Sequence, residues 1–330
     1  MTTTTLPAPA LPVSAAGPSR RSIASGVWRV ADPKITLASV ASMIVGGAVA
    51  GHDGPMAWGW LALTVLGVFA VEAGKNASGE IFDWDSGADT GLTDAERTPF
   101  SGGKRVLVDG LMSRRQTAMM AAAFYLLAIA VGLAIVLGRE PRVLYLGVVG
   151  VALAYFYHAP PLQLAYRGLG ELAVAVSYGP VIAAGTYLVQ RHAVSTGVLW
   201  ASAPLGLAIA AFLWVNELPD ARADAAAGKR TLVVRLGHRR AAWAFVALIA
   251  VAYAGVLALP LAGLPRASWG GLLGLPLALV AARRLVRVTG AGAADDGAAE
   301  LVPAQAATLL SFVLMAVGLG AGLIVSAALA

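Results

Sequence analysis

Long apolar stretches separated by short polar ones dominate the chain, and nine of them are long enough to be considered as membrane-spanning helices. They are Ile35–Gly51, Met56–Ala73, Gln116–Leu137, Val143–Tyr157, Leu169–Val189, Val198–Val215, Ala241–Leu261, Trp269–Ala282 and Pro303–Ala328. Prolines and glycines interrupt several of these stretches, which membrane helices tolerate because neighbouring helices satisfy the freed carbonyl groups. The pattern predicts an all-α, polytopic membrane protein with nine transmembrane helices.

The N-terminal segment differs in composition from the rest of the chain. Thr, Pro, Ala and Ser dominate it, and no charged side chain precedes Arg20 and Arg21. A signal peptide has its positive charge first and its apolar core afterwards, which is the opposite order. We therefore expect residues 1–27 to form a disordered tail with no cleavable leader, and residues 28–330 to form a single transmembrane domain.

Composition agrees with a membrane location. Hydrophobic residues make up 58% of the chain and charged residues 13%, and the mean hydropathy is +0.74, which is far from the values of ordinary soluble domains. A formal charge of +6 can indicate nucleic-acid binding, but in so apolar a chain the arginines of cytoplasmic loops explain it better. The expected partner is the lipid bilayer, not nucleic acid. The chain has no cysteine, which excludes disulfides and thiolate metal sites.

The distribution of positive charge predicts an orientation. If the N-terminus faces the cytoplasm, all but four of the 24 lysines and arginines lie on the cytoplasmic side; the exceptions are Arg139, Arg142, Arg191 and Arg266. This asymmetry is typical of inner-membrane proteins. We expect a multi-pass protein of the inner (cytoplasmic) membrane, with its N-terminus in the cytoplasm and its polar site at the cytoplasmic face.

Two groups of amide and carboxylate side chains come after apolar segments at helical spacing. Asn216, Asp220 and Asp224 lie at i, i+4 and i+8, and therefore form one stripe on a helix. The other group has a similar spacing and consists of Asn76, Glu80 and Asp83, with Asp89 close behind. Carboxylates at a membrane boundary are costly to dehydrate, so they mark a functional site with a positive partner.

The ligand chemistry favours a divalent cation and a phosphate-bearing substrate. Oxygen ligands suit Mg²⁺, which also keeps waters and substrate phosphate oxygens in its coordination shell. Basic side chains come after both acidic groups in flexible, glycine-containing segments and can bind the remaining phosphate oxygens. They are Arg97, Lys104 and Arg105 after the first group, and Lys229 and Arg230 after the second.

Three stretches together carry a resemblance to a known family. They run from Phe82 to Asp89, from Tyr166 to Glu171 and from Asn216 to Gly237. With these motifs the chain resembles the UbiA superfamily of intramembrane aromatic prenyltransferases, and within it the 1,4-dihydroxy-2-naphthoate polyprenyltransferase branch of menaquinone synthesis. The similarity covers Trp28 to Ala328 and implies a UbiA-type bundle of nine helices.

The resemblance also implies a reaction: Mg²⁺-dependent transfer of a polyprenyl group from polyprenyl diphosphate to an aromatic acceptor. It assigns the metal to Glu80, Asp83, Asp89, Asp220 and Asp224. It assigns catalysis to Asp83, Asp220, Asp224 and Lys229. Substrate contacts would come from Asn76, Asn216, Arg97, Lys104, Arg105 and Arg230, with Arg167, His158 and Tyr187 as candidates for the acceptor. The chain departs from its relatives at Gly79-Glu80, where they usually carry Asn-Asp.

Two other interpretations remain open at this point. A transporter also carries charged groups in membrane helices, but it places them near the midplane of the bilayer and often in two repeated halves. The acidic groups here lie at helix ends and precede basic loops, which favours an enzyme. A prenyltransferase of specialised metabolism or a membrane terpene cyclase would use the same diphosphate chemistry on the same scaffold.

Overall fold

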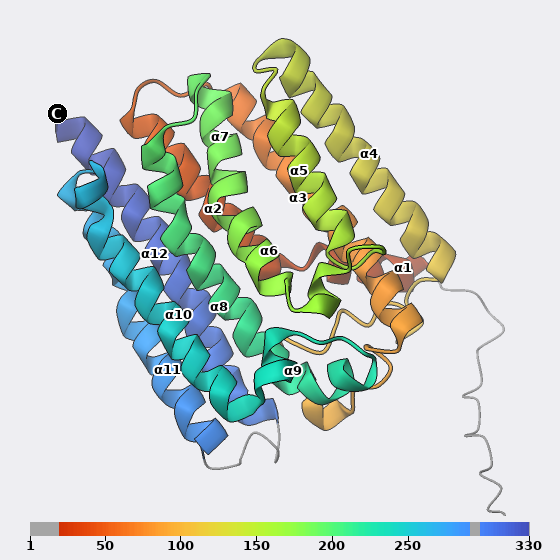
Figure 1. Ribbon diagram of the computed structural model, residues 1–330. Coiled ribbons are helices and arrows are strands. Elements are labelled where there is room, and N and C mark those ends of the chain that lie inside the picture. The colour runs from red at the N-terminus through yellow and green to blue at the C-terminus, as the bar shows by residue number, and fades with distance from the viewer. Residues whose placement is uncertain (1–19, 291–297, 330) are drawn as a thin grey trace, which may run out of the picture.

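The computed structural model describes residues 20–290 and 298–329, and within these ranges the protein is helical with no strand. The α-helices are α1 (Arg20–Ala31), α2 (Pro33–His52), α3 (Trp58–Ser86), α4 (Arg114–Gly138), α5 (Val143–Phe156), α6 (Gly170–Val176), α7 (Ile182–Arg191), α8 (Thr196–Ala226), α9 (Leu232–Leu236), α10 (His238–Ala258), α11 (Leu275–Gly290) and α12 (Val302–Leu329). Shorter turns are η1 (Asp94–Glu96), η2 (Leu164–Arg167), η3 (Ser177–Val181), η4 (Leu259–Ala262), η5 (Arg266–Gly274) and η6 (Ala298–Leu301). The long helices lie roughly side by side in one bundle (Figure 1).

The main core lies between α2, α8, α10, α11 and α12. Its largest fully buried side chains include Leu205, Phe245, Phe312 and Leu319. Helices in lipid gain no hydrophobic driving force from associating, so small residues that allow close backbone approach are common at their contacts. Gly206 of α8 shows this directly, because a Cβ there would clash with the carbonyl oxygen of Ala175. The core thus fixes α8, which carries the second acidic group.

A break separates α6 from α7 at the π-helical turn η3. Pro180 lies inside this turn, and Gly179 has non-helical backbone angles (φ −91°, ψ −105°). Proline lacks the N–H that the helical ladder needs and its ring crowds the preceding turn, which together with the angles of Gly179 distorts the helix here. π-helical turns inside helices occur frequently at functional sites. The turn carries Tyr178, a buried side chain that hydrogen-bonds to Glu72 of α3.

Membrane-spanning character is clear, and the structure supports part of the expected set of spans. Within the described ranges, five helical segments are long and apolar enough to cross a membrane: 114–138, 170–191, 196–226, 238–262 and 298–329. A bent pair of helices, 21–31 and 36–52, would make six. Each of the nine expected segments overlaps a helix, yet α3 contains charged residues and α5 has only 14 residues. The protein is therefore a multi-pass membrane protein, and the count of nine stays a prediction.

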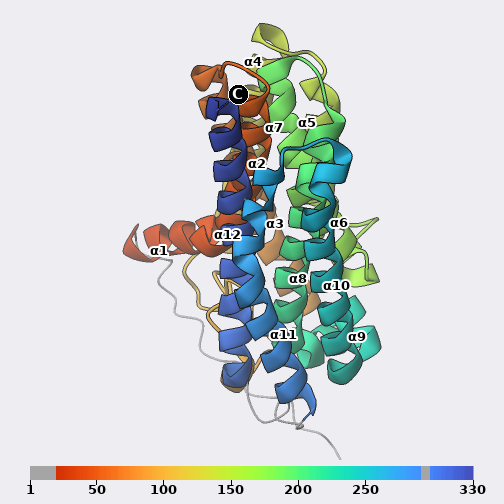
Figure 2. The ribbon, with the colours of Figure 1, turned by 90° about the vertical axis from the view of Figure 1, so that its left-hand side faces the viewer.

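Residues 20–27, which fall within the expected tail at residues 1–27, belong to helix α1, and the assignment of the tail stays a prediction. Residues 1–19 lie outside the described ranges. Helix α1 lies across the direction of the bundle helices (Figure 2). Its packing explains its order: Val30 is fully buried, its carbonyl oxygen accepts a 3.0 Å hydrogen bond from the Asn76 side chain, and Arg29 forms a 2.6 Å ion pair with Asp109. The single-domain assignment of residues 28–330 stays a prediction.

Candidate active site

A large cavity of about 1110 Å³ lies inside the bundle, and its wall includes side chains from α1 to α8. Most of the wall is apolar, and a large part of this apolar surface comes from α4, α5, α6, α7 and η3. Polar side chains gather at one end, where the C-terminal parts of α3 and α8 meet the segment between Gly87 and Ser113. The cavity therefore combines a polar end with a long apolar channel.

The second acidic group lies on one face of α8 at the polar end. Asn216, Asp220 and Asp224 all line the cavity, as the i, i+4, i+8 spacing predicts. One side-chain oxygen of each is buried without a hydrogen-bond partner: Oδ1 of Asn216, Oδ1 of Asp220 and Oδ2 of Asp224. A buried polar atom without a partner is costly, and a buried carboxylate even more so. Three such atoms in one stripe fit a bound cation, so the residues suit Mg²⁺.

Two groups hold the other oxygens of this stripe. The backbone N–H of Gly102 donates to Asp220 Oδ2 at 3.2 Å, and Lys229 Nζ lies 3.3 Å from Asp224 Oδ1. Burial by itself would lower the pKa of Lys229, but the neighbouring carboxylates of Asp224 and Asp83 outweigh it and hold the pKa well above its ordinary value. Lys229 is thus a permanent positive charge at the end of α8.

Asp83 of the first acidic group faces Lys229 from α3. Tyr166 donates a hydrogen bond to Asp83 Oδ1 at 2.8 Å, and His158 Nε2 lies 3.5 Å from Asp83 Oδ2. The His158 ring packs on Gly79, where a Cβ would lie 2.8 Å from its Cε1 atom. Burial lowers the pKa of His158 to about 4, so the ring is neutral at physiological pH. The absence of a side chain at position 79 makes room for this histidine.

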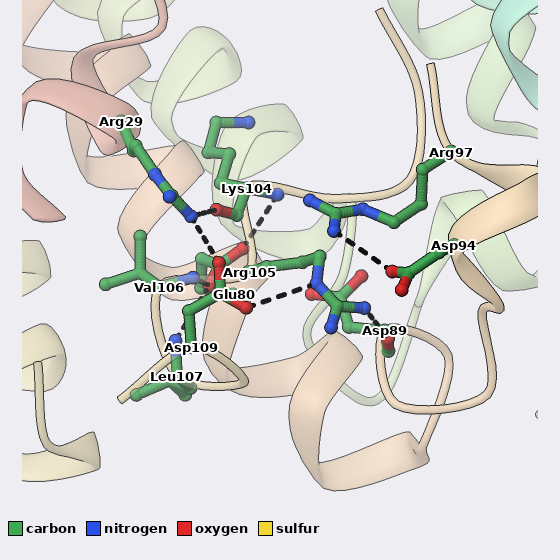
Figure 3. Close-up of polar contacts among 10 residues, drawn as sticks. All are labelled: Arg29, Glu80, Asp89, Asp94, Arg97, Lys104, Arg105, Val106, Leu107 and Asp109. Carbon is green, nitrogen blue, oxygen red and sulfur yellow. Dashed lines mark hydrogen bonds and ion pairs between the residues drawn. The ribbon is translucent and has the colours of Figure 1, made fainter. Parts of the chain in front are cut away.

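Glu80 has a different environment from its neighbours. Its carboxylate accepts backbone hydrogen bonds from Lys104 at 3.1 Å, from Val106 at 2.7 Å and from Leu107 at 3.4 Å. Figure 3 shows the carboxylate surrounded by this segment. The side chain is buried, yet it is not among the residues that line the cavity. These contacts give Glu80 the geometry of an anchor for the loop, and its expected role as a metal ligand stays a prediction.

Asp89 completes the acidic side chains at the polar end. It is buried and lines the cavity. Gly103 passes so close that a Cβ there would clash with Asp89 Oδ1, and its φ of +70° also favours glycine. Burial, and then the charges of Asp83 and Glu80, raise the pKa of Asp89 to about 8. Negative charge is therefore crowded here, and a cation would relieve it.

The predicted basic residues divide into two sets. Lys104 and Arg97 line the cavity; Lys104 Nζ lies 3.5 Å from Asp32 Oδ2, and Arg97 lies 3.5 Å from Asp94. Arg105 is not on the cavity wall, and it contacts Asp109 at 3.4 Å (Figure 3). Lys104 and Arg97 are consequently better placed than Arg105 to meet an anionic substrate.

Three more predicted residues are not brought to the cavity. Arg167 donates to the carbonyl oxygen of Pro161 at 2.8 Å, and Arg230 is exposed. Tyr187 donates to Asp53 Oδ2 at 2.6 Å, in the loop between α2 and α3 and so at the opposite end of the bundle (Figure 1). None of the three lines the cavity. Nor do any three acidic or histidine side chains of the described ranges converge on one point as a complete metal site.

The structure also places side chains in the cavity that the sequence motifs did not single out. The buried Glu72 and Tyr178 and the half-buried Lys75 form a polar group along the wall, and Glu217 lies beside Asn216. A signal for the first of these existed in the sequence. Glu72 interrupts the apolar stretch Met56–Ala73, and an ionisable residue inside a membrane segment is by default a candidate for function.

Comparisons with known proteins agree with this architecture. A model of the UbiA prenyltransferase family matches residues 39–296. The 1,4-dihydroxy-2-naphthoate octaprenyltransferase of Mycobacterium tuberculosis is 31% identical over 294 residues, which cover 89% of this chain and 94% of the relative. The 2-carboxy-1,4-naphthoquinone phytyltransferase of Synechocystis is 31% identical over 226 residues, covering 67% and 70% of the two chains. A UbiA homolog from Archaeoglobus fulgidus, solved with GPP and Mg²⁺, shares the fold with a TM-score of 0.57 at 18% identity, covering 91% of this chain and 99% of its own.

Proposed function

Because the chain belongs to the UbiA prenyltransferase family, we propose that this membrane prenyltransferase transfers a polyprenyl group from polyprenyl diphosphate to an aromatic acceptor with the help of Mg²⁺. Relatives named for a naphthoate substrate support 1,4-dihydroxy-2-naphthoate as the acceptor, which would place the enzyme in menaquinone biosynthesis. The observation that carries the proposal is the stripe of unpartnered oxygens on α8, at the polar end of an apolar cavity.

The residues of the polar end suit an ion held between two helices. Asn216, Asp220 and Asp224 would bind Mg²⁺ from α8, and Asp83 and Asp89 would bind it from the opposite side. Bound Mg²⁺ supplies neutralisation of the diphosphate as it leaves. We assign Glu80 to the loop instead, because both of its oxygens already accept backbone hydrogen bonds.

Basic side chains on the cavity wall stabilise the diphosphate leaving group. Lys229 is held charged by Asp224 and Asp83, and Lys104 and Arg97 lie on the same cavity wall. Fixed positive charges in a water-poor site stabilise the negative charge that develops on the departing oxygen. The allylic C–O bond breaks as the diphosphate departs, and a carbon of the acceptor ring forms the new C–C bond. The ring regains aromaticity by losing the proton or carboxyl group of that carbon.

The apolar part of the cavity suits the isoprenoid tail. Helix α4 lies at the edge of the bundle (Figure 1), and Ile129 and Leu133 of α4 and Leu144 and Val148 of α5 line the cavity with accessible side chains. The wall is thus open towards the region where lipid would lie. A substrate dissolved in the bilayer could enter sideways with its tail, while its diphosphate group reaches the polar end.

The charge distribution supports an orientation for this site. Lys104, Arg105, Lys229 and Arg230 lie at the polar end, whereas Arg139 and Arg142 lie in the loop at the opposite end (Figure 1). By the positive-inside rule, the polar end faces the cytoplasm. We propose that the enzyme lies in the inner membrane, with its N-terminus and its active site on the cytoplasmic side.

Product analysis tests this function. Purified protein is incubated with Mg²⁺, geranylgeranyl diphosphate and a panel of aromatic acids that includes 1,4-dihydroxy-2-naphthoate, and the products are identified by mass. We expect a prenylated acceptor, no turnover in excess chelator, and recovery when Mg²⁺ is added back. Prenylation in full chelation would contradict the metal role. A cyclised terpene formed without any acceptor would show a terpene cyclase instead.

A further inference from the structure

A second polar cluster lies in the cavity wall, next to the polar end. It consists of Ser39 of α2, Glu72 and Lys75 of α3, and Tyr178 of η3, and all four side chains line the cavity. Tyr178 donates to Glu72 Oε1 at 3.0 Å, Ser39 donates to Glu72 Oε2 at 2.5 Å, and Lys75 Nζ donates to the Tyr178 hydroxyl at 2.9 Å. We call these four residues the Lys75 cluster.

The members of the Lys75 cluster differ in how well their hydrogen-bonding groups are satisfied. Both Glu72 oxygens accept a hydrogen bond, so this carboxylate is complete. A lysine ammonium has three N–H donors, and the structure gives Lys75 one hydrogen-bond acceptor, the Tyr178 hydroxyl, within the described ranges. A positive group that borders an apolar cavity with spare donors is suited to an anionic or strongly polar ligand.

The Lys75 cluster borders the diphosphate site, since Lys75 immediately precedes Asn76 on α3. Lys75 precedes Asp83 by eight residues on α3, which corresponds to about 12 Å along the helix axis. The polar end already contains Lys229, Lys104 and Arg97 for the diphosphate. Lys75 borders the same cavity from further along α3, and an acceptor ring that reaches the allylic carbon of a bound prenyl group would lie close to it.

We propose that Lys75, held in place by Tyr178 and Glu72, binds an oxygen anion of the aromatic acceptor and thereby determines which acceptors the enzyme uses. This inference rests on the proposed prenyltransferase function and adds the recognition of its second substrate. The oxygen anion is either a carboxylate or an ionised ring hydroxyl. A ring that carries neither group would leave the ammonium unpaired when water is expelled, and is rejected for that reason.

Two cluster variants and one control test the proposal. Lys75→Met removes the charge with a side chain of similar length, and Tyr178→Phe removes only the hydroxyl that holds the ammonium. Ser78→Ala is the matched control, because Ser78 lies on the same helix, does not line the cavity and pairs with Tyr125 at 3.2 Å. Thermal melting in detergent shows which variants are folded. If Lys75→Met is unfolded, Lys75→Arg and Tyr178→Phe provide the comparison.

The measurements are KM for each substrate and, independently of turnover, equilibrium dialysis of the acceptor with the purified protein. For Lys75→Met we expect KM and Kd for 1,4-dihydroxy-2-naphthoate to rise about 10- to 100-fold, while KM for geranylgeranyl diphosphate stays within about twofold. Tyr178→Phe should cause a smaller rise and Ser78→Ala none. Comparison with 1,4-naphthalenediol identifies the oxygen: a loss confined to the acid indicates its carboxylate, and an equal loss for both indicates a ring hydroxyl.

Other results would distinguish the role of Lys75 in acceptor binding from the proposed transfer reaction. A rise in KM for the diphosphate with acceptor binding unchanged, or no change in either substrate, would overturn the role of Lys75. If wild-type protein binds the acceptor in a Lys75-dependent manner but forms no prenylated product, the recognition role stands and the proposed transfer reaction fails.

Discussion

The two acidic helix ends look alike in the sequence but differ in the structure. On α8, Asn216, Asp220 and Asp224 each keep a buried oxygen without a partner. On α3, Glu80 accepts backbone hydrogen bonds on both oxygens, and Asp83 is paired with Tyr166 and His158. The carboxylates of the α8 end therefore have free oxygens that suit a cation, whereas most carboxylate oxygens of the α3 end already contact protein groups.

This difference has a physical origin in the segment that comes after each helix. The segment after α3 is long and turns back over the helix end, so its backbone N–H groups need acceptors, and Glu80 supplies them. The segment after α8 turns sharply at Gly228, whose φ is +77°, and returns a lysine to the helix end. A carboxylate at helical spacing can thus be a ligand or an anchor, and the adjoining loop decides which.

The largest effect should come from removing a carboxylate of the α8 end. Asp220→Ala should lower turnover by about 100- to 1000-fold. The variant loses a buried carboxylate that would hold the cation, and the cation stabilises the negative charge that develops on the leaving group. Initial rates at saturating substrate measure the effect. Asp85→Ala is the control: Asp85 is a carboxylate at the end of α3, but it is exposed and pairs with Arg114 at 2.7 Å, so its loss should change the rate less than about twofold.

Asp83→Ala sharpens the comparison between the two helix ends. We expect a comparably large loss, because Asp83 faces Lys229 and lines the cavity. Retention of more than about half of the wild-type rate by either Asp220→Ala or Asp83→Ala would exclude that residue as a direct ligand. Normal membrane insertion and melting temperature in both variants would show that the loss is catalytic.

Much of the fold could be predicted from the sequence because apolar length and helical spacing are local properties. The all-helical, membrane-spanning architecture and the position of Asp220 and Asp224 on one face needed only those rules. The break at Gly179-Pro180 and the approach of Tyr178 to Glu72 depend on how distant helices pack, which no local pattern contains. The position of Tyr187 depends on packing in the same way: its chemistry suits a substrate contact, but its hydroxyl pairs with Asp53 in the loop between α2 and α3.

The role of Glu80 can be separated from that of a metal ligand. Glu80→Gln replaces one acceptor oxygen with a donor NH₂ group, which leaves a buried backbone N–H of the 104–107 segment unpaired at a cost of about 1–3 kcal/mol. We expect turnover to fall about 10-fold and the loop to become more sensitive to proteolysis. The Mg²⁺ concentration for half-maximal rate should stay within about twofold of wild type.

A metal ligand would behave differently in that experiment. If the Mg²⁺ requirement of Glu80→Gln rises about 10-fold or more while the loop stays as resistant to protease as in wild type, Glu80 binds the ion and the assignment as an anchor is wrong. Glu80→Asp provides a second check, because its carboxylate keeps the charge but is one methylene too short to reach the N–H groups on both sides.

The last variant tests why the α3 end carries glycine at position 79. Gly79→Asn introduces the asparagine that the family resemblance implies at this position, but its Cβ would meet the His158 ring, with contacts of 2.8 Å to Cε1 and 3.0 Å to Nδ1. The ring must then move away from Asp83, and we expect kcat/KM to fall about 10-fold, in line with the usual cost of overpacking a buried site. His158→Ala alone should also lower kcat/KM, since Asp83 loses a neighbour.

In the double variant, the introduced asparagine gains the space of the ring, and its amide can take the place of the imidazole. The losses should therefore be less than additive, with a coupling of about 1 kcal/mol or more. Strictly additive losses would mean that the glycine and the histidine are independent features, and that His158 does not replace the missing amide.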